Sequence, residues 1–163
     1  MSVAEITETR QYLTFKLGDE VFATDVAKVR EVLDFTSITK IPRTTDFMSG
    51  VINLRGTVVP VVDLRLSFEM SKTEKTVNTC IVVVEMLVEG EPTVIGALAD
   101  SVEEVIDLEP DQIQPPPRIG TQIRTEFIKG MGKRDTQFIM ILDIDRVFSA
   151  QELSTVRAVE TAA

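Results

Sequence analysis

Apolar residues occur along this chain in short runs rich in valine and isoleucine, interrupted roughly every eight to twelve residues by glycine, proline, asparagine or aspartate. Apolar and polar positions alternate in 11–24 around a central Gly-Asp pair, which is typical of a β-hairpin with one solvated face. A second hairpin is predicted over 50–64, with Arg55 and Gly56 at its turn. Pro60 cannot donate a ladder hydrogen bond, so we expect its strand at a sheet edge or with a bulge.

The second half of the chain continues the same pattern. Strands are predicted over 79–87, 93–99 and 101–108. The longest irregular stretch is 109–124, and its triple proline favours an extended conformation. A last hairpin is predicted over 127–144. The fold class expected from the whole pattern is all-β.

Two parts of this pattern repeat. The sequence of 29–34 matches that of 102–107, and 47–64 matches 127–144 without a gap. The repeat indicates two related units of about five strands, and each unit could close into a small barrel that leaves few exposed strand edges. Chance similarity between two valine-rich hairpins remains an alternative explanation.

The pattern also sets expected boundaries. We expect a flexible N-terminus over 1–10 and one globular domain over 11–148, divided into subdomains at roughly 11–70 and 77–148. A capping-box motif begins the final segment, which predicts a C-terminal helix and tail over 149–163.

The charge of the chain restricts its partners. The formal net charge is −9 at pH 7, which argues against nucleic acid and anionic membrane surfaces as partners. No apolar run is long enough to cross a bilayer, so no membrane insertion is expected. The chain has a single cysteine and begins without a signal-peptide pattern, which predicts a cytoplasmic protein without disulfides.

The sequence offers little catalytic chemistry. It contains no histidine, the commonest general base and metal ligand. The glycine-containing stretch 130–134 lacks the spacing of a phosphate-binding loop. Asp63 and Asp143 end equivalent strands of the repeat, where a carboxylate could cap the following turn or, less readily, contribute to a metal site. We therefore expect a protein that is not an enzyme and has no catalytic residue, cofactor or metal site.

Arg55 is the most conspicuous candidate for binding. It stands at a predicted hairpin tip inside a long apolar stretch, where its planar guanidinium could bind a carboxylate through two hydrogen bonds. Glu31, in the other block of the same repeat, is its candidate partner. An ordinary surface arginine beside a glycine turn remains the alternative.

These stretches together resemble the CheW family, the adaptor proteins of bacterial chemotaxis. The resemblance extends from the first predicted hairpin to the last, over 11–148, and its most specific element is the Asn-Leu-Arg-Gly turn followed by an apolar strand, aspartate and arginine. It implies two SH3-like five-stranded β-barrels packed together, with a core between them. It also implies a cytoplasmic, non-catalytic scaffold that links the histidine kinase CheA, through its regulatory domain, to the cytoplasmic tip of chemoreceptors (methyl-accepting chemotaxis proteins).

The resemblance also implies a set of protein-binding residues. In the family the kinase contacts faces of both barrels, and the receptor contacts an apolar groove between them. Glu31 and Arg55 match an acidic and basic pair, and further positions match the surface around that pair: Val29, Val32, Gly50, Asn53 and Gly56.

Two other functions remain open from the sequence. One is a stand-alone regulatory module of this type that serves a kinase of another pathway. The other is a carboxylate-metal enzyme that uses Asp63 and Asp143.

Overall fold

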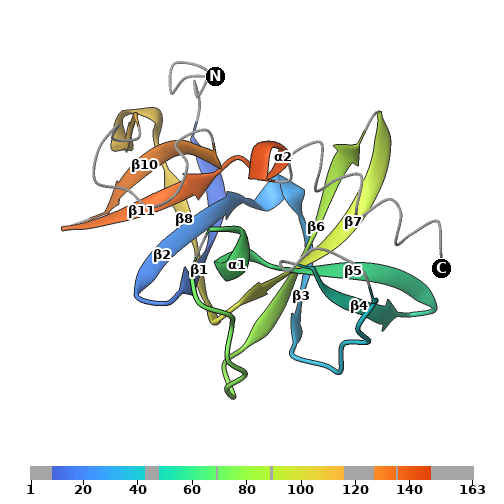
Figure 1. The fold of residues 1–163 in the computed structure, drawn as a ribbon. Helices are drawn as coiled ribbons and strands as arrows, with labels where there is room; N and C mark the ends of the chain where they lie inside the picture. The colour runs from blue at the N-terminus through green and yellow to red at the C-terminus, as the bar shows by residue number, and fades with distance from the viewer. Residues whose placement is uncertain are drawn as a thin grey trace.

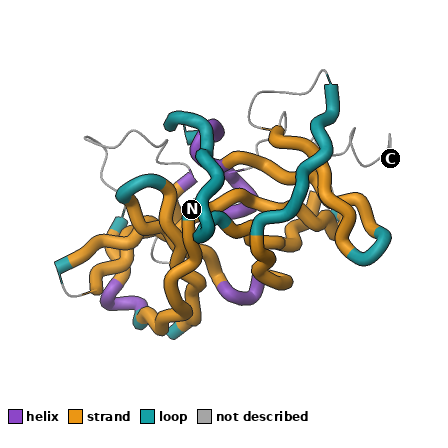
Figure 2. The backbone as a smooth tube through the Cα atoms, turned by 90° about the horizontal axis from the view of Figure 1, so that it is seen from below, coloured by secondary structure: helices purple, strands orange, loops and turns teal. Residues whose placement is uncertain are grey.

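The computed structural model describes residues 9–42, 48–68, 70–88, 90–115, 127–134 and 136–147. Its strands are β1 (Arg10–Leu17), β2 (Glu20–Asp25), β3 (Val29–Asp34), β4 (Met48–Leu54), β5 (Thr57–Asp63), β6 (Cys80–Val88), β7 (Glu91–Ala99), β8 (Ser101–Leu108), β9 (Ile113–Gln114), β10 (Ile128–Arg134) and β11 (Gln137–Leu142). Its helical turns are η2 (Val26–Lys28), α1 (Leu64–Ser67), η3 (Pro110–Gln112) and α2 (Ile144–Val147). Figures 1 and 2 show two strand-rich lobes side by side, with only short helical segments.

The described strands form two sheets. The first barrel has the strand order β3-β6-β7-β5-β4, and an isolated bridge between Thr39 and Val51 joins its two edges. The second barrel has the order β8-β1-β2-β11-β10-β9, and it closes through η3, which carries the chain from β8 to β9 beside β10. The all-β expectation is confirmed, with a sixth, two-residue strand in the second barrel.

The subdomain boundaries predicted from the sequence, 11–70 and 77–148, are wrong. The N-terminal hairpin β1–β2 does not join the first barrel, because β1 pairs with β8 and β2 pairs in parallel with β11. In turn, β6 and β7 complete the first barrel beside β3 and β5. The first barrel is thus inserted between β2 and β8. The outer segments 1–8 and 148–163, and with them the expected C-terminal helix, lie outside the described residues.

The internal repeat is confirmed. Hairpin β4–β5 corresponds to β10–β11 in the ungapped register read from the sequence, and a short helix follows each hairpin. Both hairpins shift register next to a glycine, Gly50 in one and Gly130 in the other. In both barrels the second strand of this hairpin pairs in parallel with a strand from another hairpin.

Three apolar cores explain the long apolar runs of the sequence. In β6 the side chains of Val82 and Val84 enter a core between the barrels, whereas Ile81 and Val83 enter the core of the first barrel. In β11, Met140 and Leu142 enter the inter-barrel core, and the alternate residues enter the core of the second barrel. Because successive side chains of a strand point to opposite faces, a strand between two cores is apolar throughout.

Aromatic rings join the barrels within the inter-barrel core. Phe15 and Phe22 of the second barrel stack with centroids 6.1 Å apart, and Phe22 stacks on Phe68 at 5.6 Å. Phe68, the residue after α1, lies with its ring centroid 6.1 Å from that of Phe127, which precedes β10. Each buried ring contributes on the order of 2–3 kcal/mol through burial of apolar area, so this row is a major part of the junction.

Pro60 does not mark an edge strand, contrary to expectation. Its strand β5 lies between β4 and β7, and the bulge of the hairpin is in β4. The parallel pairing of β5 with β7 begins only at Val61, so Pro60 lies just before the paired segment and is tolerated there.

No helix in the described parts of the chain is long and apolar enough to cross a membrane.

Candidate functional site

The β4–β5 hairpin ends in a two-residue turn formed by Arg55 and Gly56. Both residues have positive φ, 51° and 86°, as in the turns that fit the twist of a hairpin. Arg55 is the one non-glycine residue with positive φ among the described residues, a conformation that costs about 1–2 kcal/mol. The Asn53 side chain supports the turn, because its Oδ1 accepts a hydrogen bond from the Gly56 N–H at 2.7 Å. Three of the predicted site residues therefore build one turn.

The Arg55 guanidinium pairs with the Glu31 carboxylate of β3. Nη1 donates to Oε1 at 3.3 Å, and Nη2 donates to Oε2. The Arg55 side chain is 70% exposed and that of Glu31 is 29% exposed, so the pair stands on the surface. The hydrogen bond from Arg55 lowers the pKa of Glu31, and the same contact raises the pKa of Arg55. The pairing expected from the sequence is present, and both groups are charged at neutral pH.

A depression of about 280 Å³ lies beside this pair at the mouth of the first barrel. Its floor is apolar and includes Val59, Val83 and Val94. Arg30 and Glu31 line its rim together with Arg55, and Arg30 also pairs with Glu85 at 2.6 Å. An apolar floor with a charged rim is the arrangement found at the centre of many protein interfaces.

The two predicted valines lie apart from this turn. Burial alternates along β3, so Val29, Glu31 and Leu33 are half-buried and the residues between them are exposed. Val29 packs against the inter-barrel core. Val32 is 40% exposed and lies on the same face of β3 as Val29, because the register shifts between Val29 and Glu31 and both valines pair with residues that enter the inter-barrel core. The two valines therefore lie on the face of β3 opposite to Glu31.

Gly50 is buried within the barrel wall. Its φ is 144°, and a Cβ placed on it would lie 2.1 Å from the backbone oxygen of Thr39. Thr39 and Val51 exchange two backbone hydrogen bonds of 2.9 and 2.8 Å at this point, which is where the first barrel closes. Gly50 thus allows the backbone at Thr39 to approach β4 closely enough to close the first barrel, which carries the Arg55 turn.

A counterpart of the Glu31–Arg55 pair, missed from the sequence, occurs in the second barrel. Arg134 on β10 pairs with Glu104 on β8 at 3.0 Å. Val105 and Phe138 beside them are 51% and 49% exposed. The internal repeat could have predicted this second pair. It aligns Glu104 with Glu31, and it places Arg134 one position before the equivalent of Arg55.

The two strand-end aspartates each have a protein partner. Asp63 is buried, and its carboxylate accepts hydrogen bonds from the N–H of Arg65 and from the N–H and hydroxyl of Thr73. Asp143 lies 3.6 Å from Arg146. Among the residues that the structure describes, no cluster of three or more acidic, cysteine or histidine side chains could hold a metal ion. Asp63 therefore caps α1, as expected.

Comparison with known proteins identifies the family. The family model of the CheW-like domain matches residues 11–152. The chemotaxis protein CheW of Klebsiella aerogenes is 33% identical over 92% of this chain and 88% of its own length. That of Rhizobium meliloti is 32% identical over 88% of this chain and 90% of its own. The crystal structure of the scaffolding protein TtCheW from Thermoanaerobacter tengcongensis superposes with a TM-score of 0.78 and 37% identity, covering 88% of this chain and 90% of the other. The chain belongs to the family of proteins with a CheW-like domain.

Proposed function

We propose that this protein is a non-catalytic adaptor of chemotaxis signal transduction that couples chemoreceptors to the histidine kinase CheA. Relatives that cover nearly the whole chain are named chemotaxis proteins, and a relative of known structure is named a scaffolding protein. The observation that carries the proposal is the exposed Glu31–Arg55 pair, held on a backbone turn of positive φ. An exposed ion pair contributes only about 0–1 kcal/mol to stability, so presentation to a partner explains its geometry better than stability does.

The kinase contact is assigned to the mouth of the first barrel. There the regulatory domain of CheA would meet the apolar floor inside the charged rim of Arg30, Glu31 and Arg55. The related pair Glu104–Arg134, with the exposed Val105 beside it, supports a second contact on the other barrel.

The receptor contact is assigned to the margin of the inter-barrel core, where Val29 is half-buried. A helical receptor tip presents apolar side chains at helical spacing, which an apolar margin with a polar rim can accept. The cytoplasm is the compartment in which such a receptor tip and the kinase meet.

Substitutions at the ion pair test the kinase contact. We expect Arg55→Ala to weaken binding of the CheA regulatory domain about tenfold or more in a titration, with a thermal midpoint close to that of the wild type. The exchange variant Glu31→Arg/Arg55→Glu restores an internal pair but reverses the charges that the partner meets, so it should not recover binding. Arg10→Ala, which removes an exposed pair with Asp25 on the second barrel, is the matched control. Unchanged kinase binding by Arg55→Ala contradicts the assignment.

A second substitution separates the two partners. Val29→Lys should weaken binding of a receptor tip fragment and leave kinase binding intact, because it places a charge at the apolar margin between the barrels. Val77→Lys, at a 99% exposed valine in the loop that precedes β6, is the control and should retain receptor binding. If the wild type binds the kinase but no chemoreceptor tip, the protein is instead a regulatory module for a kinase of another pathway.

A further inference from the structure

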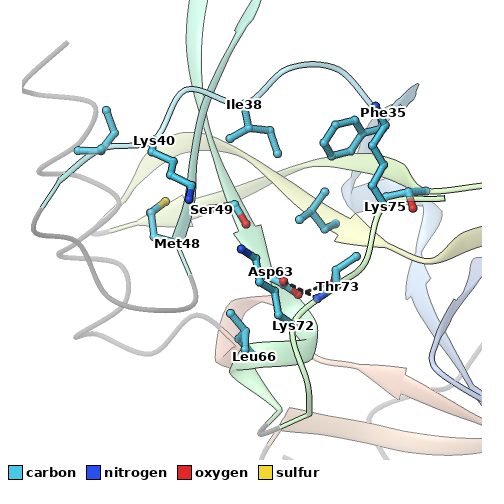
Figure 3. Close-up of a pocket in the computed structure, with 13 residues that line it drawn as sticks. Phe35, Ile38, Lys40, Met48, Ser49, Asp63, Leu66, Lys72, Thr73 and Lys75 are labelled. Carbon is cyan, nitrogen blue, oxygen red and sulfur yellow. Dashed lines mark hydrogen bonds between the residues drawn. The ribbon is translucent and has the colours of Figure 1, made fainter.

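The first barrel has a second cavity, of about 450 Å³, with no residue in common with the depression beneath the ion pair. Figure 3 shows it between the segment that follows β3, the start of β4, helix α1 and the loop that precedes β6. A volume of this size is in the range of small-molecule sites. Much of its lining is apolar and comes from the following side chains: Phe35, Ile38, Ile41, Met48, Leu66 and Leu98.

Three lysines surround this cavity in a chain whose net charge is −9. Figure 3 shows the side chains of Lys40 and Lys72 directed into the same space. The amino group of Lys75 lies 4.8 Å from the centre of the Phe35 ring. Within the described parts of the chain, none of these lysines forms an ion pair with a carboxylate. Asp63 is the one acidic group among the described lining residues, so the formal charge of these residues is positive.

Two of these lysines, Lys72 and Lys75, lie in the loop that precedes β6. This loop has no regular secondary structure, but hydrogen bonds hold it in place. Asp63 binds the backbone and hydroxyl of Thr73. Arg65 donates to the carbonyl and hydroxyl of Ser71 at 2.9 and 3.0 Å, and to Asp100 at 2.9 Å. Asp63 is buried and the Arg65 side chain is 19% exposed, so both anchors are shielded from solvent. The cavity is therefore formed before any ligand enters, which reduces the ordering cost of binding.

We propose that this cavity binds a small organic anion with an apolar body, such as an aromatic or aliphatic carboxylate or sulfonate. The acid group would lie between the amino groups of Lys40 and Lys72, and the apolar body would contact Phe35 and Leu66. Three lysines without a carboxylate partner among the described residues, beside an apolar surface, favour such a ligand over a neutral one. Only an anion with an apolar body can interact favourably with both the amino groups and the apolar side chains of the lining.

The test uses the full chain and 8-anilinonaphthalene-1-sulfonate, an aromatic sulfonate whose fluorescence rises in apolar surroundings. We expect saturable binding that weakens with added salt, and amide chemical-shift changes in an NMR titration that centre on 35–41, 63–66 and 72–79. Lys40→Gln/Lys72→Gln should weaken binding about tenfold. The control Lys129→Gln/Lys133→Gln removes the same charge from β10 of the second barrel and should bind like the wild type.

A competitor pair then tests the need for charge. Naphthalene-2-sulfonate should displace the probe, whereas neutral 2-naphthol at pH 7 should be at least about tenfold less effective. Equal competition by the two compounds, shift changes centred elsewhere, equal loss in the control variant, or no saturable binding would each overturn the proposal. None of these measurements uses the kinase or the receptor, so their failure leaves the adaptor function untouched.

Discussion

At the scale of single residues, two glycines of the β4–β5 hairpin have different structural roles. Gly50 and Gly56 both have positive φ, but only Gly50 faces another part of the backbone, Thr39, at a distance that excludes a Cβ. A Cβ on Gly56 would meet nothing within 4 Å. Gly50 therefore belongs to the closure of the first barrel, and Gly56 belongs to the turn that presents Arg55.

Alanine at these two positions should have unequal effects. Gly50→Ala should lower the free energy of unfolding by about 3 kcal/mol or more, because the methyl group adds a backbone collision to the conformational strain. Gly56→Ala should cost only about 1 kcal/mol, from the positive φ alone. Chemical denaturation of the two variants measures both values. Similar losses would show that the contact with Thr39 is not the limiting constraint.

The Glu31 carboxyl should report the ion pair directly. Its pKa is lowered in the folded protein, chiefly by the hydrogen bond from Arg55, so the stabilising contact is present above the unfolded pKa and is lost as pH falls through the folded pKa. A carboxyl-detected NMR titration should place the Glu31 pKa below its ordinary range. Arg55→Ala should raise that pKa towards the ordinary range, whereas Arg10→Ala should leave it unchanged. An identical Glu31 pKa in wild type and Arg55→Ala would mean that the pair does not persist in solution.

At the scale of elements, a single carboxylate fixes both α1 and the loop after it. Asp63 accepts hydrogen bonds from Arg65 N–H at 3.1 Å and Thr73 N–H at 3.0 Å, and a third from the Thr73 hydroxyl at 2.6 Å. The equivalent Asp143 makes a longer contact with Arg146, and it is the backbone carbonyl of Asp143 that accepts the N–H groups of α2. Both copies of the repeat thus have an aspartate at the end of the strand, but the two carboxylates make different contacts.

Alanine substitutions should reveal this asymmetry. Asp63→Ala should reduce the free energy of unfolding by about 2–4 kcal/mol, since it removes a cap and leaves buried donors without partners. Asp143→Ala should cost less than about 1 kcal/mol, the value of a weak ion pair. Thermal and urea denaturation would measure the difference. Equal losses would indicate that the two aspartates are structurally equivalent after all.

At the scale of the whole molecule, the sequence predicts each hairpin well, but it does not predict which hairpins share a barrel. Local alternation and turn residues define β1–β2 and β4–β5, and the repeat gives the register of β10–β11. The pairing of β1 with β8 joins segments far apart in the chain, and nothing in the local pattern of either strand encodes its neighbour.

The site was predictable to a similar degree. Arg55 and Glu31 could be paired because the repeat places their blocks together, and the structure joins them. The placement of Gly50 and Val32 away from that pair follows from barrel closure and from the alternation of β3, which require knowledge of the neighbouring strands. A resemblance between sequences marks positions of interest and does not separate a contact residue from the residue that positions it.

Fragments should behave according to the observed sheets. The fragment 29–100 contains the five strands of the first barrel, and we expect it to unfold cooperatively with a dispersed NMR spectrum. The fragment 77–148, one of the subdomains expected from the sequence, lacks β1 and β2 and contains two strands of the other barrel, so it should not fold. A cooperative melt of 77–148 would contradict the central place of the N-terminal hairpin in the second barrel.

The insertion of one barrel within the other also affects the order in which the molecule can assemble on the ribosome. The hairpin β1–β2 leaves the exit tunnel before the first barrel, yet β8 and β11, which flank it in the finished sheet, are translated only after the whole first barrel. At about 5–20 residues per second, this apolar hairpin waits on the order of ten seconds without its neighbours. During that interval the backbone N–H and C=O groups along both edges of the hairpin have no partner strand. This is the stage at which the nascent chain is most prone to aggregate.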